Sequence, residues 1–464
     1  MAKNKQKTTT NLTTPPPNEA AKAVESGSNQ APQTAVNTGG FTWTVRNIHK
    51  LIVFVFGCLL YVNTLGYDHA VDDAIVITDN MHTQQGIAGI GGILGKDTFH
   101  GFFRDDKKLV EGGRYRPLSL VLFAIEMQLA GKEMKDKNGN TMKSPMSGDV
   151  MKGIAAIGHF GNMMLYGFTG ILLYMLLLLL FQRNTAEDSA ITTRAELIAL
   201  LGSMIFLAHP VHTEAVANIK GCDEILSLLG SLGALWLTLK SFYKNDFIKL
   251  LLSGLVFFLG LMAKENAITF LAIVPLAFYF FSNATPAQIV KQTAPLFVGA
   301  VAFMVMRTMA IGNQFGATPM ELMNNPFVVL GEDRLYHAAS FSEKYGTIVY
   351  TLGEYLKLLF YPATLTHDYY PRHIELMDFS NSKVLIAAAM YISLIAYAIY
   401  GTLKKQPLAF AVLFYLLSLS IVSNIVFPVG TNMAERFLYM PSVGFALALS
   451  LGIVHFIKNK NIAF

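Results

Sequence analysis

Two adjacent carboxylates, Asp72 and Asp73, lie in the stretch GYDHAVDDAIVITDN at residues 66–80. A carboxylate there could take a proton from a hydroxyl as a general base, or it could bind a metal ion. In an extended chain neighbouring side chains point to opposite faces, so one carboxylate could face a reaction site while the other holds the loop. The alternative is that the aspartates cap a helix or a turn.

A pair of arginines, Arg114 and Arg116, precedes the apolar run PLSLVLFAIEMQLA. A guanidinium group binds phosphate through a planar fork of donors. Pro117 favours the first position of a helix, and the N-terminus of a helix attracts anions. The pair is therefore a candidate phosphate site, and the alternative is anchoring to anionic lipid head groups.

Two histidines, His209 and His212, begin the stretch HPVHTEAVANIKGCDE at residues 209–224. Pro210 should end the preceding helix. The pattern is not the His-Glu-x-x-His of zinc proteases, and a third metal ligand could come only from a chain that folds back. The stretch is thus a hydrogen-bonded helix cap at the interface or a substrate-binding wall. The motifs require no metal and no cofactor.

Further ionisable residues adjoin apolar runs. Carboxylates close to a bilayer core are costly and are functional candidates by default, so Glu214, Asp223 and Glu224 are candidates for sugar or acceptor binding. Lys264 in LMAKENAITF and Arg436 in NMAERFLYMP are candidates to hold a phosphate. The alternatives are a tight hairpin outside the bilayer for Lys264 and a side chain that reaches to lipid head groups for Arg436.

The elements that must position these side chains are membrane helices. The 464 residues are 53% hydrophobic and only 14% charged, with a mean hydropathy of +0.42, whereas soluble domains carry about 25% charged residues. A β-barrel would show alternating runs of about ten residues instead. Apolar runs near the roughly 20-residue bilayer length recur, so we predict an all-α polytopic membrane protein with about 10–12 transmembrane helices.

The predicted spans are 49–66, 157–181, 195–209, 224–241, 247–263, 266–282, 293–312, 383–403, 407–427 and 437–457. The segment 345–361 carries Glu354 and Lys357 and could cross, tilt or re-enter. Cys58 and Cys222 lie in or at apolar segments, and we expect no disulfide between them. The net charge of +5 is spread through short loops, so we expect membrane lipids as partners and no nucleic acid.

The chain divides into a tail and a membrane domain. Residues 1–44 are rich in Thr, Pro, Asn and Ala and should form a disordered cytoplasmic tail, followed by the transmembrane domain at 45–464. Basic residues before the first span place the N-terminus in the cytoplasm. Residues 66–156 then form a large first extracytoplasmic loop. The run 117–131 within it is interpreted as an interfacial helix, although a crossing would place the following lysines in the cytoplasm. Counting ten spans puts the candidate residues on one outer face.

The chain resembles the membrane half of the transmembrane-and-tetratricopeptide-repeat protein O-mannosyltransferases. The resemblance covers roughly residues 45–457 and rests on VDDA, GGRYRPLSLVLF, HPVHTEAVANIKGCDEILSLL, AKENAITFLAI, AERFLYMPSVGF, and NNPFVVL followed by YLKLLFYPATLTHDYY. These enzymes belong to the GT-C glycosyltransferase superfamily, so the resemblance implies a GT-C-like fold and a polyprenyl-phosphate sugar donor, with mannose as the sugar.

The resemblance also assigns roles. In the superfamily an acidic motif in the first extracytoplasmic loop supplies the catalytic carboxylate, and here that motif matches Asp72 and Asp73. A short helix in that loop often lies along the membrane, which favours the interfacial interpretation of 117–131. The chain departs from the family because no tetratricopeptide repeats follow residue 457. Such repeats could bind polypeptide, and a chain without them suits a bacterial relative.

The predicted function is inverting transfer of a sugar, mannose, from a polyprenyl-phosphate donor to Ser or Thr hydroxyls of exported proteins. It would take place on the periplasmic face of a bacterial inner membrane. Asp72 or Asp73 would accept the hydroxyl proton. The leaving phosphate would be held by Arg114, Arg116, His209, His212, Lys264 and Arg436. The sugar or acceptor would be oriented by Glu214, Asp223 and Glu224. The alternatives are a lipid or glycan acceptor, a transporter or lipid flippase, and a membrane scaffold.

Overall fold

The computed structural model describes residues 44–104, 113–135, 141–144, 148–182, 189–312, 320–322, 324–369, 372–425 and 429–459. All of them belong to one unit, Thr44–Phe464. Except for Thr44, the predicted cytoplasmic tail lies outside the described residues, so its disorder stays a prediction.

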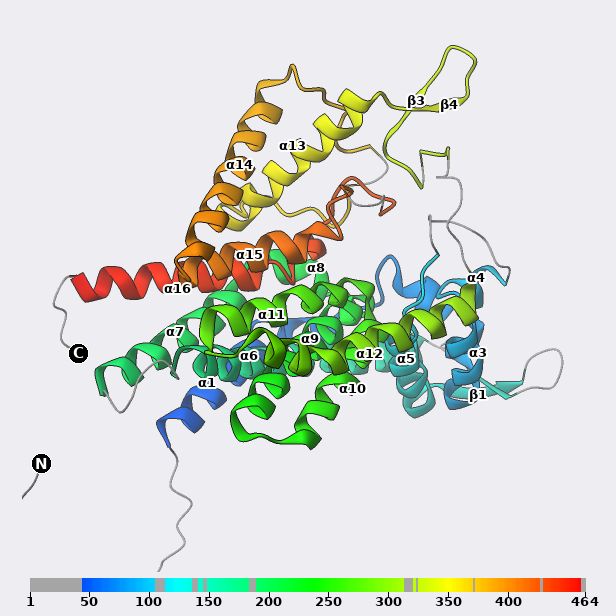
Figure 1. Cartoon of the computed structure of the whole chain (residues 1–464). Helices are drawn as coiled ribbons and strands as arrows, with labels where there is room; N and C mark the ends of the chain where they lie inside the picture. Colours follow the sequence, from blue (N-terminus) through cyan, green and yellow to red (C-terminus); the bar gives the residue numbers. More distant parts are fainter. Residues whose placement is uncertain are drawn as a thin grey trace, which may run out of the picture. The chain divides into compact units, whose positions relative to one another are not determined.

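Helices dominate the described residues, and the all-helical class predicted from the sequence is confirmed (Figure 1). The α-helices are α1 (Val45–Leu59), α2 (Met81–Gln84), α3 (Ile90–Gly95), α4 (His100–Phe103), α5 (Pro117–Ala130), α6 (Gly148–Gln182), α7 (Ser189–Ala208), α8 (Thr213–Val216), α9 (Cys222–Lys244), α10 (Phe247–Ala263), α11 (Phe270–Phe281), α12 (Pro286–Ile311), α13 (Phe341–Phe360), α14 (Ser382–Leu403), α15 (Pro407–Ser420) and α16 (Ser442–Asn459). Short 3-10 or π-helical turns are η1 (Val62–Gly66), η2 (Ala74–Thr78), η3 (Gly86–Gly89), η4 (Pro210–His212), η5 (Ile219–Gly221), η6 (Glu265–Thr269) and η7 (Glu435–Leu438).

Two small antiparallel hairpins complete the described structure. Strand β1 (Lys132–Lys135) pairs with β2 (Thr141–Ser144), with Lys132 opposite Ser144. Strand β3 (Val328–Leu330) pairs with β4 (Tyr336–Ala338), with Val328 opposite Ala338. Neither hairpin was predicted from the sequence.

The helices fall on the predicted apolar segments, but fewer of them than predicted are long enough to span a bilayer. Five described helices are both long and apolar enough, at 45–66, 151–182, 219–244, 286–311 and 382–403. A sixth span is possible if 194–208 and 210–216, which meet at an angle of 55°, are counted together. Six other apolar helices have only 10–17 residues, which is shorter than the roughly 20 residues that a perpendicular crossing needs. The structure thus confirms a multi-pass membrane protein, while length and composition alone do not support the predicted count of about 10–12 spans.

Glycines bring α9 and α10 close together in the main bundle. A Cβ atom added at Gly230 would lie 2.7 Å from the Cα atom of Gly260, so the two backbones approach without side chains between them. Small residues allow such close approach between membrane helices. The connecting turn places Asn245 in the left-handed region at φ 51°, and the side chain of Asp246 caps α10. The N-terminal end of α9 therefore lies beside the C-terminal end of α10.

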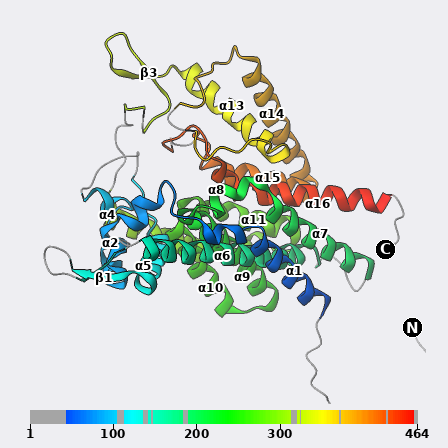
Figure 2. The same cartoon turned by 180° about the vertical axis from the view of Figure 1, so that it is seen from behind.

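Helices α13 and α14 pack on each other and join the rest of the unit through α15 and α16 (Figures 1 and 2). Helix α16 in turn packs against α7. The small helices α2 and α3 and the turns η2 and η3 pack around α5, and α4 packs on α2 and η2. The loop after α1 contacts the turn η5, and the segment between α15 and α16 contacts η4 and α8. Both therefore lie where the chain leaves α7 and enters α9.

Helix α5 begins at Pro117, as predicted, and has 14 residues, a length of about 21 Å against a hydrocarbon core of about 30 Å. Phe123 and Met127 are buried against Val76 and Ile77 of η2. Glu126 is buried as well, and burial raises its pKa to about 8. The short length agrees with a helix that does not cross the membrane, and its depth in the interface stays a prediction.

Candidate functional site

Charged side chains from several separate segments meet at the ends of the bundle helices. This charge cluster consists of Asp72, Arg114, Arg116, Glu214, Lys220, Asp223, Glu224, Lys264, Glu265 and Arg436. Breaks in the helices place them there. Helix α7 ends at Ala208, α9 begins at Cys222, and α10 ends at Ala263 with Lys264 in an extended conformation. Seven candidate residues were predicted from the sequence in addition to the acidic pair and the two histidines. The structure brings all seven together in this cluster.

The two members of the acidic pair have different surroundings. Asp73 is only 1% exposed, and its two carboxylate oxygens accept backbone N–H groups of Ala70 and Lys220, each at 2.8 Å. Burial raises the pKa of Asp73 to about 6. The side chain of Asp72 is 36% exposed, with the Lys220 ammonium 3.5 Å from its carboxylate. Asp73 therefore holds the loop, and Asp72 faces the cluster.

The charge on Asp72 is favoured by its neighbours. Burial alone would raise the pKa of this carboxyl, but the positive charges of Lys220, Arg436 and Arg114 outweigh burial and hold it below its usual value. A carboxylate stabilised in this way is ionised at neutral pH. It can accept a hydrogen bond from a hydroxyl that enters the cluster.

Arg116 forms the centre of a network of ion pairs. Its Nε and Nη2 atoms donate to the two carboxylate oxygens of Glu265, at 3.0 and 2.6 Å, and Nη1 donates to Asp223 at 3.1 Å. The Lys220 ammonium lies 3.7 Å from the same oxygen of Asp223. Three of the five N–H donors of this guanidinium are thus used by carboxylates, so Arg116 holds the acidic ends of α9 and η6 together.

Lys264 is also committed, to a buried ion pair with Glu224. Both side chains are at most 2% exposed. The second oxygen of Glu224 accepts from the amide of Asn266 at 3.3 Å, and the Ser227 hydroxyl donates to that amide's oxygen at 2.9 Å. Lys264 connects α10 with η6, and whether this turn lies outside the bilayer stays a prediction.

Arg436 is held by Glu214, which contacts both its guanidinium and its backbone. The backbone N–H of Arg436 donates to Glu214 at 2.7 Å, and the guanidinium pairs with the other oxygen. The ring of Phe437 lies between two cations, with its centre 5.4 Å from the Arg436 guanidinium and 5.4 Å from the Lys264 ammonium. Cations over an aromatic face are attracted by the ring quadrupole.

Arg114 differs from the other cations because no carboxylate among the described residues pairs with its guanidinium. The guanidinium instead stacks over the ring of Phe99 at 5.0 Å from its centre. Its backbone is anchored by an N–H donated to Asp97 at 2.8 Å. Burial lowers the pKa of Arg114 to about 10, so the group remains cationic at neutral pH. With no carboxylate partner among the described residues, its donors can bind an anion.

The structure does not bring the two histidines to the cluster. His209 caps η4, accepting from the Val211 N–H with one ring nitrogen while the other lies 3.0 Å from the Leu359 carbonyl. His212 is fully buried, with its ring nitrogens 2.7 Å from the Tyr166 hydroxyl and 2.8 Å from that of Ser442. Both nitrogens of each ring are occupied, which agrees with the helix-cap alternative and leaves no donor for a phosphate.

Two members of the cluster, Lys220 and Glu265, were missed as site residues in the sequence. Lys220 precedes Asp223 by three residues, a spacing that predicts an ion pair across a helical turn. Glu265 follows Lys264 directly, and its partner Arg116 is distant in the chain, so no local pattern indicates the pairing. Among the described residues no group of three or more His, Cys, Asp or Glu side chains is arranged to hold a metal ion.

An apolar cavity of about 500 Å³ adjoins the cluster, between η6 and α12. Ile268 of η6, three residues after Glu265, and Met304 of α12 are among its walls. Phe303 of α12 contacts the ring of Tyr115, which lies between the two arginines in the chain, at 6.2 Å between ring centres. The exposed face of α12 is apolar, with Phe297 61% and Met309 82% exposed. The cavity therefore opens onto the exposed apolar face of α12.

Comparison with known proteins links these features to a family of transferases. No family model matches the chain. A protein O-mannosyl-transferase of Caenorhabditis elegans is 28% identical over 270 residues, 57% of this chain and 36% of the relative. Protein O-mannosyl-transferase TMTC4 of Mus musculus is 24% identical over 444 residues, 87% of this chain and 55% of the relative. The chain thus spans about half the length of this TMTC4 relative and less of the other, and its resemblance to the membrane half of this family is confirmed.

Solved structures give a weaker likeness. An oligosaccharyltransferase of Archaeoglobus fulgidus, crystallised with a tethered acceptor peptide, matches 89% of this chain and 51% of its own with 13% identity and a TM-score of 0.41.

Proposed function

We propose that this multi-pass membrane protein is a glycosyltransferase that moves mannose from a polyprenyl-phosphate donor to Ser or Thr hydroxyls of exported proteins. The observation that carries the proposal is the position of Asp72, an accessible and ionised carboxylate beside several cations. One of these cations, Arg114, has no carboxylate partner within the described residues. The names of the relatives, all called protein O-mannosyl-transferases, supply the reaction class.

The proposed chemistry is a single displacement with inversion. The acceptor oxygen attacks the anomeric carbon, its proton passes to the carboxylate of Asp72, and the bond between that carbon and the phosphate oxygen breaks. General bases of this kind contribute about 10²- to 10⁴-fold in rate. The polyprenyl phosphate leaves with both electrons of the broken bond and gains negative charge, which nearby cations stabilise.

Arg114 is the residue that we assign to the donor phosphate, because its guanidinium has donors to spare. Arg436 and Lys220 add positive potential on the same side, as their effect on the pKa of Asp72 indicates. Arg116 and Lys264 act as positioning residues, since their carboxylate partners occupy them. His209 and His212 take no part in this mechanism.

The apolar cavity between η6 and α12 supports a lipid-linked donor. A polyprenyl chain needs an apolar groove open to the bilayer, and this cavity begins three residues from Glu265 of the cluster. A tail in the cavity would place its phosphate near the arginines that flank Tyr115. We further propose that the cluster lies on the periplasmic face of a bacterial inner membrane, where exported acceptors pass.

The proposed function is tested by mass spectrometry of exported glycoproteins with and without the protein. The proposal expects a single hexose to disappear from Ser or Thr residues when the gene is deleted, and to return with the wild type but not with Asp72→Asn. Loss of sugar from glycolipids or glycans alone, with protein sites unchanged, would transfer the assignment to another acceptor class.

A further inference from the structure

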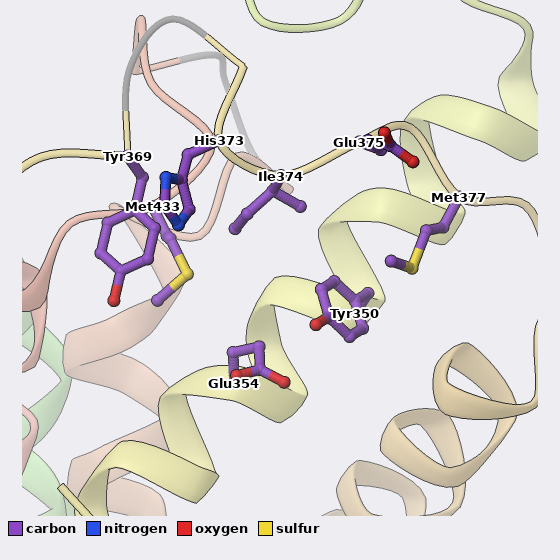
Figure 3. A pocket seen from close by; sticks show the side chains of 8 residues that line it. All are labelled: Tyr350, Glu354, Tyr369, His373, Ile374, Glu375, Met377 and Met433. Carbon is purple, nitrogen blue, oxygen red and sulfur yellow. The ribbon is translucent and has the colours of Figure 1, made fainter. Parts of the chain in front are cut away.

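A second cavity, of about 310 Å³, lies beside α13 and has no role in the transfer chemistry (Figure 3). One wall is the face of α13 that carries Tyr350 and Glu354. The opposite wall is the segment after α13, and Met433 closes one end. Figure 3 shows the carboxylates of Glu354 and Glu375 coming from these two different walls.

The wall opposite α13 is fixed by hydrogen bonds rather than left as a loose loop. The N–H of Met377 donates to the hydroxyl of Thr347 at 2.8 Å, and the amide of Asn432 donates to the carbonyl of Ile374 at 3.3 Å. A Cβ atom at Gly346 would lie 2.3 Å from the carbonyl oxygen of Met377, so only glycine lets the segment approach α13 this closely. The cavity is therefore formed before any ligand binds.

The second cavity and the charge cluster share one segment of chain. The hydroxyl of Tyr369, a lining residue, donates to Glu435 at 3.2 Å, and the N–H of Thr366 donates to the same oxygen at 2.6 Å. The next residue, Arg436, belongs to the charge cluster through Glu214. Met433, two residues before Glu435, lines the cavity. The wall of the cavity and the charge cluster are thus joined directly through residues 433–436 of the chain.

The lining favours a cation. Two carboxylates and two tyrosine rings line the cavity, and no lysine or arginine is among its lining residues. Glu354 pairs with Lys357 at 2.8 Å on the exposed side of α13, whereas Glu375 has no ion pair within the described part of the chain. The ammonium of Lys383 already lies 5.9 Å from the centre of the Tyr350 ring. An aromatic face beside a carboxylate is a favourable site for an ammonium or guanidinium group.

We propose that this cavity binds a lysine or arginine side chain of the acceptor polypeptide, close to the Ser or Thr that receives the sugar. The proposal rests on the proposed function, because it takes the acceptor to be a polypeptide. A phosphate finds no lysine or arginine in the lining, which holds His373 besides the carboxylates and tyrosines, and an apolar tail would leave the carboxylate of Glu375 without a partner. Glu375 is expected to contribute most, because its charge is not already neutralised.

The test uses the purified full-length protein and three fluorescein-labelled nine-residue peptides. Each has a central threonine in an alanine background, with lysine, glutamine or glutamate at the two positions two residues away from it. Binding is measured by fluorescence anisotropy without donor, at low and high salt. The lysine peptide is expected to bind about fivefold more tightly than the glutamine peptide, from one cation–π contact and one partly exposed ion pair.

Glu375→Gln should abolish this preference, and Glu375→Lys should reverse it in favour of the glutamate peptide. The matched control is Glu332→Gln, an exposed glutamate on the β3–β4 turn, which should keep the preference. Equal affinity of the wild type for all three peptides, no binding of any, or an unchanged preference in Glu375→Gln would overturn the inference. A preference that persists while no sugar is transferred would instead count against the proposed function, because binding is measured independently of transfer.

Discussion

The ammonium nitrogen of Lys220 lies 3.5 Å from a carboxylate oxygen of Asp72. The backbone N–H of the same lysine donates to Asp73 at 2.8 Å, so the first turn before α9 contacts both members of the acidic pair. The ammonium of Lys220 lowers the pKa of the exposed Asp72, and its backbone N–H holds the buried Asp73 in place. This division leads to separate expectations for the two aspartates.

Asp72→Asn should lower kcat by about 100-fold or more, because the amide cannot accept the proton, while the unfolding temperature in detergent stays unchanged. Asp73→Asn should instead cost about 1–3 kcal/mol of stability, since one of two buried N–H groups would lose its acceptor. Transfer from polyprenyl-phosphate mannose and thermal unfolding measure the two effects. Full activity in Asp72→Asn would exclude this residue as the base.

Lys220→Met should change the pH profile of transfer. The base acts in its ionised form, so activity is lost as the pH falls through the pKa of Asp72, which the surrounding cations hold below its usual value. Removing Lys220 removes the largest of these attractions and raises the pKa, so the loss of activity on acidification should begin at a higher pH. The control is Lys404→Met, on an exposed turn, for which the profile of kcat/KM should stay in place. Identical profiles for wild type and Lys220→Met would contradict the contact.

Arg114→Gln should weaken donor use by about 10- to 100-fold in kcat/KM, as expected for a charge-assisted contact to phosphate. Arg116→Gln should act differently. It removes the ion-pair partner of Glu265 and one of the two cations beside Asp223, so it should mainly lower the unfolding temperature. Steady-state kinetics against varied donor and thermal unfolding separate the two. If Arg114→Gln left kcat/KM for the donor intact, the phosphate assignment would have to move to Arg436.

Lys264→Met should destabilise the protein by about 3–5 kcal/mol, because Glu224 would remain as an unpaired charge beside Asp223. The double variant Lys264→Met/Glu224→Gln removes both charges and should recover most of the lost stability. Denaturation in mild detergent measures all three forms. Additive losses in the double variant would show that the two side chains do not depend on each other.

Gly230→Ala should destabilise the bundle by about 1–3 kcal/mol, since the added methyl group would meet the backbone of Gly260. Gly452→Ala in α16 is the control, because a Cβ atom there meets nothing within 4 Å. The control should be neutral or slightly stabilising. Unfolding temperatures compare the two, and equal behaviour would show that α9 and α10 are not in contact at this glycine.

The sequence predicted the local parts of the site well. The expected difference between Asp72 and Asp73 is present in their contacts, but it arises in a turn that leads into η2 and not in the extended chain from which alternation was argued. Pro117 and Pro210 marked the start of α5 and the end of α7 correctly. The positions of the apolar helices also followed from composition, because a run of apolar residues needs no information about distant partners.

Long-range pairing could not be predicted. Arg116 and Glu265 are far apart in the chain, and only the packing of α5 against α10 brings them together. His212 has the residue type of a ligand, yet Tyr166 and Ser442, from distant helices, take both its nitrogens. The lengths of the helices could not be predicted either, because an apolar run does not reveal where a helix ends, and several described helices end after 10–17 residues.

The hydrogen bond between Asp73 and the backbone of Lys220 has a mechanical consequence. It ties the loop that carries Asp72 to the turn η5 just before α9, although the loop follows α1 and the turn follows α8. A motion that shifted this turn would carry Asp72 along with it. The contact between Asp72 and the ammonium of Lys220 would then be conserved during such a motion.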